Sequence, residues 1–277
     1  MSVVPQADPD GSRPQPGAGP NAGGIEKWTD ERVLAIRYWT PKLLSFRSTR
    51  GSGFRFTPGH YTRLGLGAAD DIVWRPYSMT SAADADHLEF IALLVPGGAF
   101  SEQLKQSRVG DALRVDKASY GFLTVDQLAP GKDLWLLASG TGLGPFLSIL
   151  RDPAVWQSYE RLIVVHSVRH SSELAWRDEI AEIQNGDLFA DAKATLRYLP
   201  IVTREPGATP LAERIPLLLA DGRLEDAAAS PLSVASSRLM VCGNPEMVRE
   251  LRQFLGARGF ATNRRSVPGQ MAFEKYW

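Results

Sequence analysis

The sequence predicts a two-part fold, an N-terminal antiparallel β-barrel followed by a C-terminal α/β part built on a parallel sheet. The chain has 277 residues, which is enough for two domains. Short β-rich runs separated by turn residues fill the first part, and after Pro130-Gly131 apolar strand candidates alternate with helical patterns. That alternation is typical of a parallel sheet covered by helices. We therefore expect a boundary near residues 128–132, with one domain over 25–130 and another over 131–277.

Residues 1–24 are expected to form a disordered tail. They contain five glycines, five prolines, no aromatic residue and no apolar periodicity. They also lack the basic start and apolar stretch of a secretory signal, and no later run approaches the ~18 apolar residues that span a bilayer. A targeting or partner-binding role for the tail stays open. With a single thiol in the chain, these features predict a cytoplasmic protein without a membrane span.

The barrel prediction rests on six short strands with few helical patterns between them. Turn sequences such as Arg50-Gly51-Ser52-Gly53 and Pro96-Gly97-Gly98 separate the strands. Short strands at this spacing favour a small antiparallel barrel or sandwich. The expected strands cover residues 33–39, 43–48, 61–66, 72–78, 88–95 and 112–115.

The second part is expected to contain four parallel strands and their connecting helices. Short apolar runs predict the strands, and helical patterns follow them. The expected strands cover residues 134–138, 162–165, 195–202 and 239–241, and the expected helices cover 145–150, 172–184, 214–219 and 245–255.

Charge and cysteine content restrict the class of function. The chain has 31 basic and 31 acidic residues, whereas proteins that bind nucleic acid through counterion release are normally basic. Its one cysteine, Cys242, excludes an intrachain disulfide and any cysteine-rich zinc or iron-sulfur site within the chain. The four histidines show no metal-ligand spacing. A protein of this composition that moves electrons needs an organic cofactor held non-covalently.

The first candidate motif, Ser139-Gly140-Thr141-Gly142-Leu143-Gly144-Pro145, directly follows a strand candidate. Glycines let the backbone approach a diphosphate closely, and the helix that begins near Pro145 offers unpaired amides and the positive end of its dipole. The spacing matches neither the Rossmann nor the Walker A pattern. The residues alone support nucleotide binding and a structural tight turn equally.

The second candidate motif, Arg75-Pro76-Tyr77-Ser78-Met79-Thr80-Ser81, ends the fourth expected barrel strand. It offers a guanidinium for a phosphate, an aromatic face for a flat ring and a hydroxyl for a ring nitrogen. A strand with a surface arginine and a packed tyrosine explains the same residues. Without further context, that simpler interpretation is favoured.

The third candidate motif, Val241-Cys242-Gly243-Asn244-Pro245-Glu246-Met247, joins the last expected strand to a helix. Asn244 suits an N-cap and Pro245 a first helical position, so a strand-to-helix turn explains most of it. Cys242 nonetheless ends a parallel strand, where open α/β sheets bind ligands. The alternative is that Cys242 is a small buried hydrophobic residue.

In this order and across this two-part layout, the three motifs resemble the ferredoxin-NADP reductase family of flavoproteins, most closely its bacterial flavodoxin/ferredoxin-NADP reductases. The resemblance covers residues 25–277 and includes the ending Tyr276-Trp277. It implies an oxidoreductase with an FAD-binding barrel and an NADP(H)-binding α/β domain.

For FAD, the resemblance implies that Arg75 contacts the diphosphate, Tyr77 stacks on the isoalloxazine ring and Ser78 lies near flavin N5. The loop from Leu94 to Ser101 would supply backbone groups to the diphosphate. The full set implied for FAD is Arg75, Pro76, Tyr77, Ser78, Leu94, Val95, Ser101 and Trp277.

Two of these FAD assignments carry a further expectation. Ser101 is a plausible N-cap of a short helix, whose N-terminus would favour an anion. Trp277 is implied to lie over the FAD, with packing on the core as the alternative and Phe273 as a second candidate for the main aromatic contact.

For NADP(H), the resemblance places Thr141 and Gly142 near the nicotinamide end and the diphosphate, with Cys242 beside the nicotinamide. A preference for NADP(H) over NAD(H) requires positive charge at the ribose 2′-phosphate. The candidates for that charge are Arg169, Arg204 and Arg214.

The implied reaction is hydride transfer between NADP(H) and FAD, followed by single-electron exchange with ferredoxin or flavodoxin. Tyr77, Ser78 and Cys242 are the residues expected at the reacting atoms, and no metal is expected. Because such carriers are usually acidic, basic side chains should guide their docking. The candidates for docking are Lys105, Arg108, Arg264 and Arg265.

We expect a monomer that binds no nucleic acid. Two other functions remain open. One is an NADH-preferring reductase of the same architecture that serves an oxygenase or reduces free flavin. The other is a non-catalytic flavin- or nucleotide-binding regulator.

Overall fold

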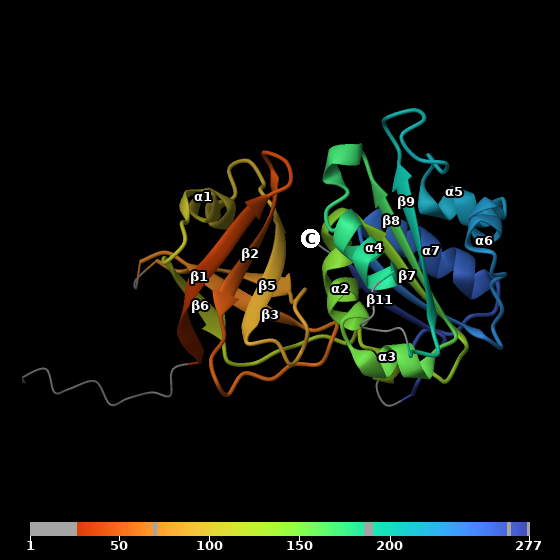
Figure 1. The fold of residues 1–277 in the computed structure, drawn as a ribbon, viewed down its shortest axis with the longest axis horizontal. Coiled ribbons are helices and arrows are strands. Elements are labelled where there is room, and N and C mark those ends of the chain that lie inside the picture. Colours follow the sequence, from red (N-terminus) through yellow and green to blue (C-terminus); the bar gives the residue numbers. More distant parts are fainter. Residues whose placement is uncertain (1–26, 69–70, 186–190, 265–266, 276–277) are drawn as a thin grey trace, which may run out of the picture.

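The computed structural model describes residues 27–68, 71–185, 191–264 and 267–275. Within them, a barrel of six strands lies beside a parallel sheet covered by helices (Figure 1). This confirms the predicted fold class. The expected tail, Arg265 and the terminal pair Tyr276-Trp277 lie outside the described residues. No helix in the described part of the chain is long and apolar enough to cross a membrane.

The barrel consists of antiparallel strands that nearly close on themselves. An isolated antiparallel bridge between Met79 and Phe90 joins the two edges of the six-stranded sheet. Phe46, Leu64 and Phe90 lie in its core, each almost fully buried. The strands are β1 (Trp28–Tyr38), β2 (Leu43–Thr49), β3 (Tyr61–Leu66), β4 (Val73–Ser78), β5 (His87–Leu93) and β6 (Ala112–Asp116), in the sheet order β4-β3-β6-β1-β2-β5.

The helix of the barrel half, α1 (Ala99–Gln106), corrects one prediction. It begins at Ala99 with Gly98 as N-cap, so the prediction that Ser101 caps it was wrong. Ser101 lies in the first turn, where its Oγ accepts a hydrogen bond from the Val95 amide at 3.0 Å. Gly97, at φ 72°, reverses the chain between them. The Ser101 hydroxyl therefore holds the turn that precedes the helix.

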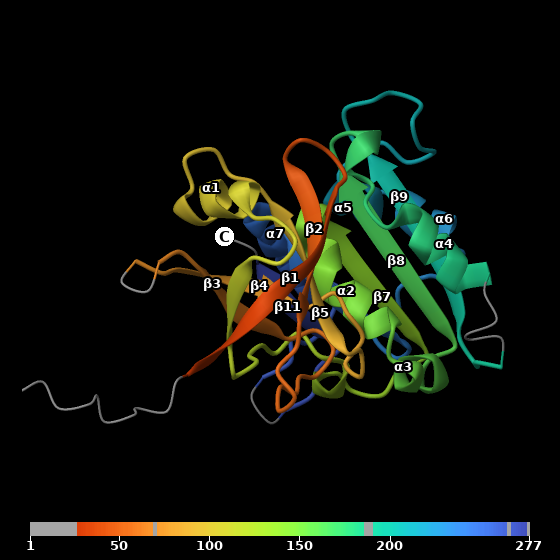
Figure 2. The ribbon, with the colours of Figure 1, turned by 60° about the vertical axis from the view of Figure 1, so that its left-hand side comes forward.

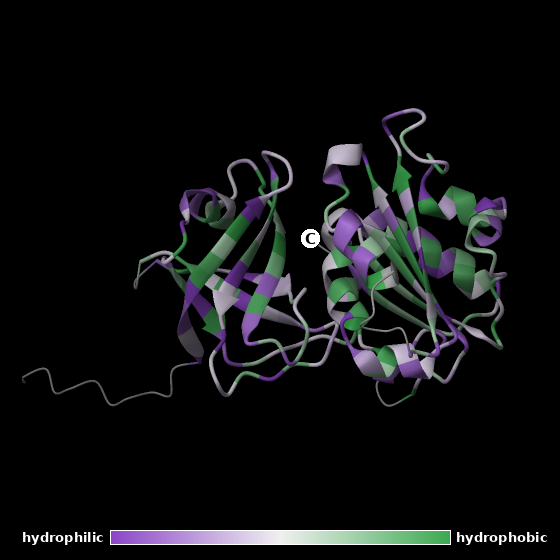
Figure 3. Cartoon of the chain, viewed as in Figure 1, coloured by the Kyte–Doolittle hydropathy of each residue, from purple (hydrophilic) through white to green (hydrophobic). Residues whose placement is uncertain are grey.

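The second half is a five-stranded sheet in which all strands are parallel. The strands Asp133–Ser139 and Ser237–Gly243 are buried along almost their whole length. Figure 3 shows apolar colours along the strands of this sheet. This burial explains their continuous apolar runs. The strands are β7 (Asp133–Ser139), β8 (Arg161–Val168), β9 (Thr195–Val202), β10 (Ser237–Gly243) and β11 (Met271–Lys275), in the sheet order β11-β10-β7-β8-β9.

Helices pack on both faces of this sheet and bury two separate apolar layers. On one face lie α2 (Gly144–Leu150), α3 (Pro153–Ser158) and α4 (Arg177–Asn185), and on the other lie α5 (Ile215–Ala220), α6 (Arg223–Ala228) and α7 (Pro245–Ala257).

The predicted helix over 172–184 is wrong in its first turn. Residues 171–173 form a 3-10 turn, and Trp176 then takes a left-handed φ of 57° before α4 begins. Its ring packs against Trp39 of the barrel half, with 4.9 Å between ring centroids. This contact between the halves accompanies the break in the helix and is not visible in the local sequence.

The two halves meet along α2. Leu43 of β2 and Ile91 of β5 belong to the same apolar core as Phe146 and Leu147 of α2. Figures 1 and 2 both show α2 as the helix beside β5. The helix that follows the glycine-rich motif therefore packs directly on the barrel.

Strand order places a possible ligand site at the carboxyl ends of β7 and β10. From β7 the chain moves outward through β8 to β9 and then returns to β10 on the other side of β7. Open α/β sheets bind ligands at such a switch point. The glycine-rich motif follows β7, and Cys242 lies near the end of β10.

Candidate active site at the switch point

The glycine-rich motif and the cysteine motif are in direct contact. A Cβ atom on Gly142 would lie 2.3 Å from the Cys242 carbonyl oxygen, so only glycine fits there. The amide of Asn244 donates to Ser139 Oγ at 2.9 Å. Gly243, at φ 133°, allows the turn that makes this bond. The structure thus brings two of the three predicted motifs together at the switch point.

Each of these turns leads into a helix as the sequence predicted. The Asn244 side chain accepts hydrogen bonds from the amides of Glu246 and Met247 at 2.9 and 3.3 Å, which confirms it as the N-cap of α7. Residues 140–143 form a 3-10 turn that runs into α2, with Pro145 in the first turn of that helix. Thr141 and Gly142 are buried within the turn.

A buried histidine supports the glycine-rich turn, although the sequence pattern did not single it out. His166 of β8 places Nε2 3.1 Å from the Gly140 carbonyl oxygen and Nδ1 3.3 Å from the Tyr198 hydroxyl. Burial lowers the pKa of His166 to about 4, so the imidazole is neutral at pH 7. Because a carbonyl only accepts, Nε2 carries the proton and Nδ1 accepts from Tyr198.

The third motif lies on β4 of the barrel. Tyr77 packs against Phe46 and Phe100, with ring centroids 6.2 and 5.2 Å away. Burial raises its pKa to about 12, so the phenol keeps its proton. Arg75 and Pro76 are exposed, and Arg75 Nη1 donates to the neighbouring Trp74 carbonyl at 2.8 Å.

Ser78 joins the barrel to the second half. Its side chain is almost fully buried, and Ser78 Oγ lies 3.4 Å from Oε1 of Glu274 on β11. Glu274 is in turn the parallel register partner of Cys242 on β10, and Cys242 is fully buried. The structure therefore gathers Ser78, Glu274 and Cys242 at one place between the halves.

Glu274 is the site residue that sequence reasoning missed. Burial raises its pKa to about 7, although the hydrogen bond from Ser78 acts in the opposite direction. A carboxyl group with such a pKa can hold or release a proton near neutral pH. The signal in the sequence was one acidic residue, next to Lys275, in an ending that is otherwise apolar and aromatic, which by itself does not indicate a site.

Two of the three candidate arginines for a 2′-phosphate lie together. Arg169 follows β8, Arg204 follows β9, and the Arg204 amide donates to the Arg169 carbonyl at 2.9 Å. Both residues are exposed. Arg214 instead donates to both carboxylate oxygens of Glu250 on α7, at 2.7 and 2.8 Å.

Comparison with known proteins agrees with this arrangement. Residues 39–123 match the family model for an oxidoreductase FAD-binding domain, and residues 136–253 match that for an oxidoreductase NAD-binding domain. The chain is 39% identical over 254 residues to "Ferredoxin--NADP reductase A" of Sorangium cellulosum, covering 91% of each chain. It is 38% identical over 249 residues to the "Ferredoxin--NADP reductase" of Pseudomonas aeruginosa, covering 88% of this chain and 96% of that one. This chain belongs to the ferredoxin-NADP reductase family.

A solved structure extends the comparison to three dimensions. The ferredoxin NADP+ reductase of Neisseria gonorrhoeae, solved with bound FAD and NADP, is 36% identical. The match has a TM-score of 0.84 and covers 90% of this chain and 99% of that one. The chain is thus a flavoprotein oxidoreductase that uses FAD and NADP(H).

The predicted second flavin loop of this reductase is a tight turn before α1. The Leu94 amide donates to the Lys42 carbonyl at 2.7 Å, and the Gly98 amide donates to the Val95 carbonyl at 3.0 Å. The Val95 side chain is exposed. Trp277, the other predicted FAD contact, lies outside the described residues.

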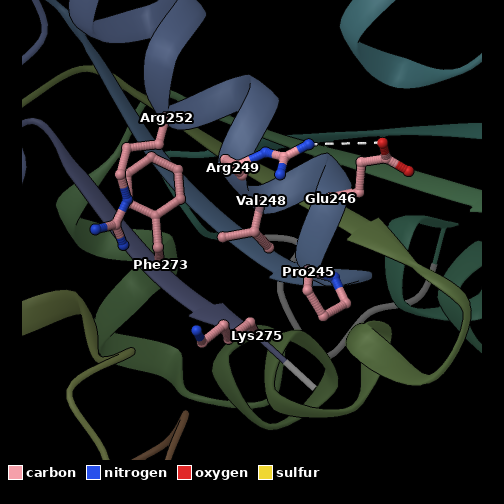
Figure 4. A pocket seen from close by; sticks show the side chains of 7 residues that line it. All are labelled: Pro245, Glu246, Val248, Arg249, Arg252, Phe273 and Lys275. Atoms are coloured by element: carbon pink, nitrogen blue, oxygen red, sulfur yellow. Dashed lines mark ion pairs between the residues drawn. The ribbon is translucent and has the colours of Figure 1, made fainter. Parts of the chain in front are cut away.

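A basic groove lies where α7 begins and β11 ends (Figure 4). It encloses about 700 Å³. The Arg252 guanidinium lies over the Phe273 ring, 4.6 Å from its centroid. Arg249 Nη2 forms an ion pair with Glu246 Oε1 at 3.6 Å. Its lining residues are Pro245, Glu246, Val248, Arg249, Arg252, Phe273 and Lys275, so three cations face one carboxylate.

The docking residues predicted from the sequence are divided between the halves. Lys105 is in the last turn of α1 and Arg108 follows that helix, both in the barrel half. Arg264 lies in the segment that leads into β11 of the other half.

Proposed function

We propose that this reductase transfers hydride between NADP(H) and the N5 atom of FAD at the place where its two halves meet, and exchanges single electrons with ferredoxin or flavodoxin. One observation carries the proposal. Ser78 of the barrel, Glu274 of β11 and the Cys242–Gly142 contact converge at the switch point of the parallel sheet.

In this proposal the barrel half, residues 25–130, holds FAD. Arg75 and Pro76 are exposed on β4, where the guanidinium is available to a diphosphate. Tyr77 offers a neutral ring for stacking, and Ser78 contacts the flavin edge near N5. The remaining FAD contacts are assigned to Leu94, Val95, Ser101 and Trp277.

Residues 131–277 hold NADP(H). Thr141 and Gly142 approach the diphosphate and the nicotinamide end, where the start of α2 supplies backbone amides. Arg169 and Arg204 take the 2′-phosphate, because they are adjacent and exposed. Arg214 contributes only if it leaves Glu250.

The bound cofactors supply the hydride and electron chemistry, and the protein positions them and controls protons. Glu274 can store or release a proton at its carboxyl oxygens, since its pKa is about 7. Ser78 donates to Oε1 and stabilises the ionised form. Buried Cys242 closes the site on the side of β10 and keeps water from it.

The electron carrier docks, in this proposal, beside the basic groove formed by Arg249, Arg252 and Lys275. An acidic protein would be attracted there although the chain has no net charge. Replacing Arg249 and Arg252 by glutamate should lower the association rate with ferredoxin or flavodoxin, most strongly at low ionic strength. We further propose a cytoplasmic monomer.

An anaerobic titration with NADPH, followed by flavin absorbance, tests the proposed function. The purified protein should be yellow and should be bleached by stoichiometric NADPH. Reduction of ferredoxin or flavodoxin, compared with free flavin under NADPH and under NADH, then identifies the acceptor. A colourless protein, or a yellow one that NADPH does not bleach, would refute the proposal and favour a binding role.

A further inference from the structure

An arginine at the end of α2 reaches across to the barrel. Arg151 directly follows α2, and its Nη1 donates to the Thr80 carbonyl at 2.5 Å and to Glu89 Oε2 at 2.9 Å. Thr80 and Glu89 belong to the barrel half, Glu89 being on β5. The Glu89 side chain is only 5% exposed and that of Arg151 is 23% exposed, so the contact is largely shielded from solvent.

Two barrel residues also donate hydrogen bonds to the Glu89 carboxylate. Arg47 Nε donates to Glu89 Oε1 at 2.8 Å, and Thr80 Oγ1 donates to Glu89 Oε2 at 3.1 Å. Burial alone would raise the pKa of Glu89, but the positive charges of Arg151 and Arg47 outweigh it, and the pKa is lowered. The carboxylate is therefore ionised at neutral pH, and both of its oxygens accept hydrogen bonds.

This clamp, formed by Arg151, Glu89 and Thr80, joins the two parts of the proposed reaction site. The N-terminus of α2 carries the glycine-rich turn, and its C-terminus carries Arg151, about 10 Å away at 1.5 Å per residue. On the barrel, Thr80 is two residues beyond Ser78. The Arg151 guanidinium therefore connects α2, which follows the glycine-rich turn, to the segment just beyond Ser78, the residue proposed to lie near flavin N5.

We propose that Arg151 is a positioning residue that sets the distance and angle between the hydride donor and the flavin by fixing α2 to the barrel. The proposal rests on the proposed function. Its physical basis is that reacting atoms need near-attack geometry, and a misplacement of 1 Å can cost about 100-fold in rate. Arg151 itself touches neither cofactor in this proposal.

Three variants separate positioning from simple stability. Arg151→Met removes the clamp while keeping much of the apolar stem. Arg151→Lys keeps the charge but not the planar fork of donors. Arg161→Met is the matched control, because Arg161 Nε pairs with the buried Asp133 at 2.7 Å entirely within the second half.

The Arg151 variants are expected to fold, because other contacts still join the halves. Trp39 and Trp176 pack across the boundary, and Leu43 and Ile91 share the core of α2. Glu89→Gln provides an independent test of the same clamp, since it keeps the side-chain shape and removes the charge.

The first readout is the limiting rate of flavin reduction at saturating NADPH, together with the dissociation constant of NADP+. Arg151→Met should lower the limiting rate by roughly 10- to 100-fold and leave the dissociation constant within about threefold. Arg151→Lys should recover part of the rate, and Arg161→Met should stay within about threefold of the parent. Equal losses in Arg151→Met and Arg161→Met would overturn the proposal.

The second readout does not depend on turnover. Spin labels on Leu34→Cys of β1 and Leu217→Cys of α5, both exposed positions, report the distance between the halves. The distance distribution should broaden in Arg151→Met and Glu89→Gln, and an unchanged distribution would refute the clamp. If the parent protein is not reduced by NADPH, the proposed function fails, while the label distances still decide whether the clamp orients the halves.

Discussion

The carboxyl group of Glu274 should make stability depend on pH in a way that one substitution removes. Its pKa lies at about 7 in the folded protein against an ordinary value of 4.5, because burial penalises the charged form more than the Ser78 hydroxyl stabilises it. The folded state therefore binds this proton more tightly than the unfolded state. The resulting stabilisation is complete below pH 4.5 and disappears as the pH rises through 7.

The size of the effect follows from the same pKa. A pKa moved from 4.5 to about 7 corresponds to about 3 kcal/mol of unfolding free energy. Glu274→Gln cannot lose a proton, so it should become more stable relative to the parent by about this amount between pH 4.5 and 7.5.

Urea unfolding of the two proteins across this pH range measures the difference directly. Other titrating groups are common to both proteins and cancel. Ser78→Ala, which removes the hydrogen bond that lowers the pKa, should move the transition to higher pH. A difference between parent and Glu274→Gln that stays constant with pH would refute the assigned burial of this carboxyl.

Two further predictions concern NADP(H) binding. Loss of both Arg169 and Arg204 should raise the KM for NADPH by ~10- to 100-fold with little change in the KM for NADH, whereas loss of Arg214 should have a smaller effect. Steady-state kinetics with both cofactors measures this difference. Equal effects on NADPH and NADH would contradict the assignment. Gly142→Ala should cost about 1–3 kcal/mol in urea unfolding and weaken NADPH binding, because its Cβ would overlap the Cys242 carbonyl. Gly256→Ala is the matched control, since an added methyl in α7 meets no atom within 4 Å and should be neutral or stabilising. Equal losses of unfolding free energy in both variants would show that the contact with Cys242 is not the cause.

Local chemistry explains where prediction succeeded. Two strands have the predicted bounds, Tyr61–Leu66 and Thr195–Val202. The helix α7 also begins as expected, with Asn244 as its N-cap and Pro245 as its first residue. Both predictions succeeded because strand pattern and helix capping depend on residues that are close in sequence. The prediction for Ser101 failed because its hydroxyl bonds to the Val95 amide across a turn. The strand β11 was missed because Met271–Lys275 is short and becomes a strand by pairing with β10.

The order of motifs along the chain was sufficient to indicate the two-part architecture, the cofactor class and the family. Periodicity, glycine spacing and capping are properties of consecutive residues, so they can be read without coordinates. The partners of those residues cannot, since they come from strands and helices far apart in sequence. Only the tertiary structure placed Glu274 against Ser78, paired Arg214 with Glu250, and joined Arg151 to Glu89. The proton affinity of Glu274 and the ion pairs of Arg214 and Arg151 each depend on burial and charge that distant segments of the chain provide.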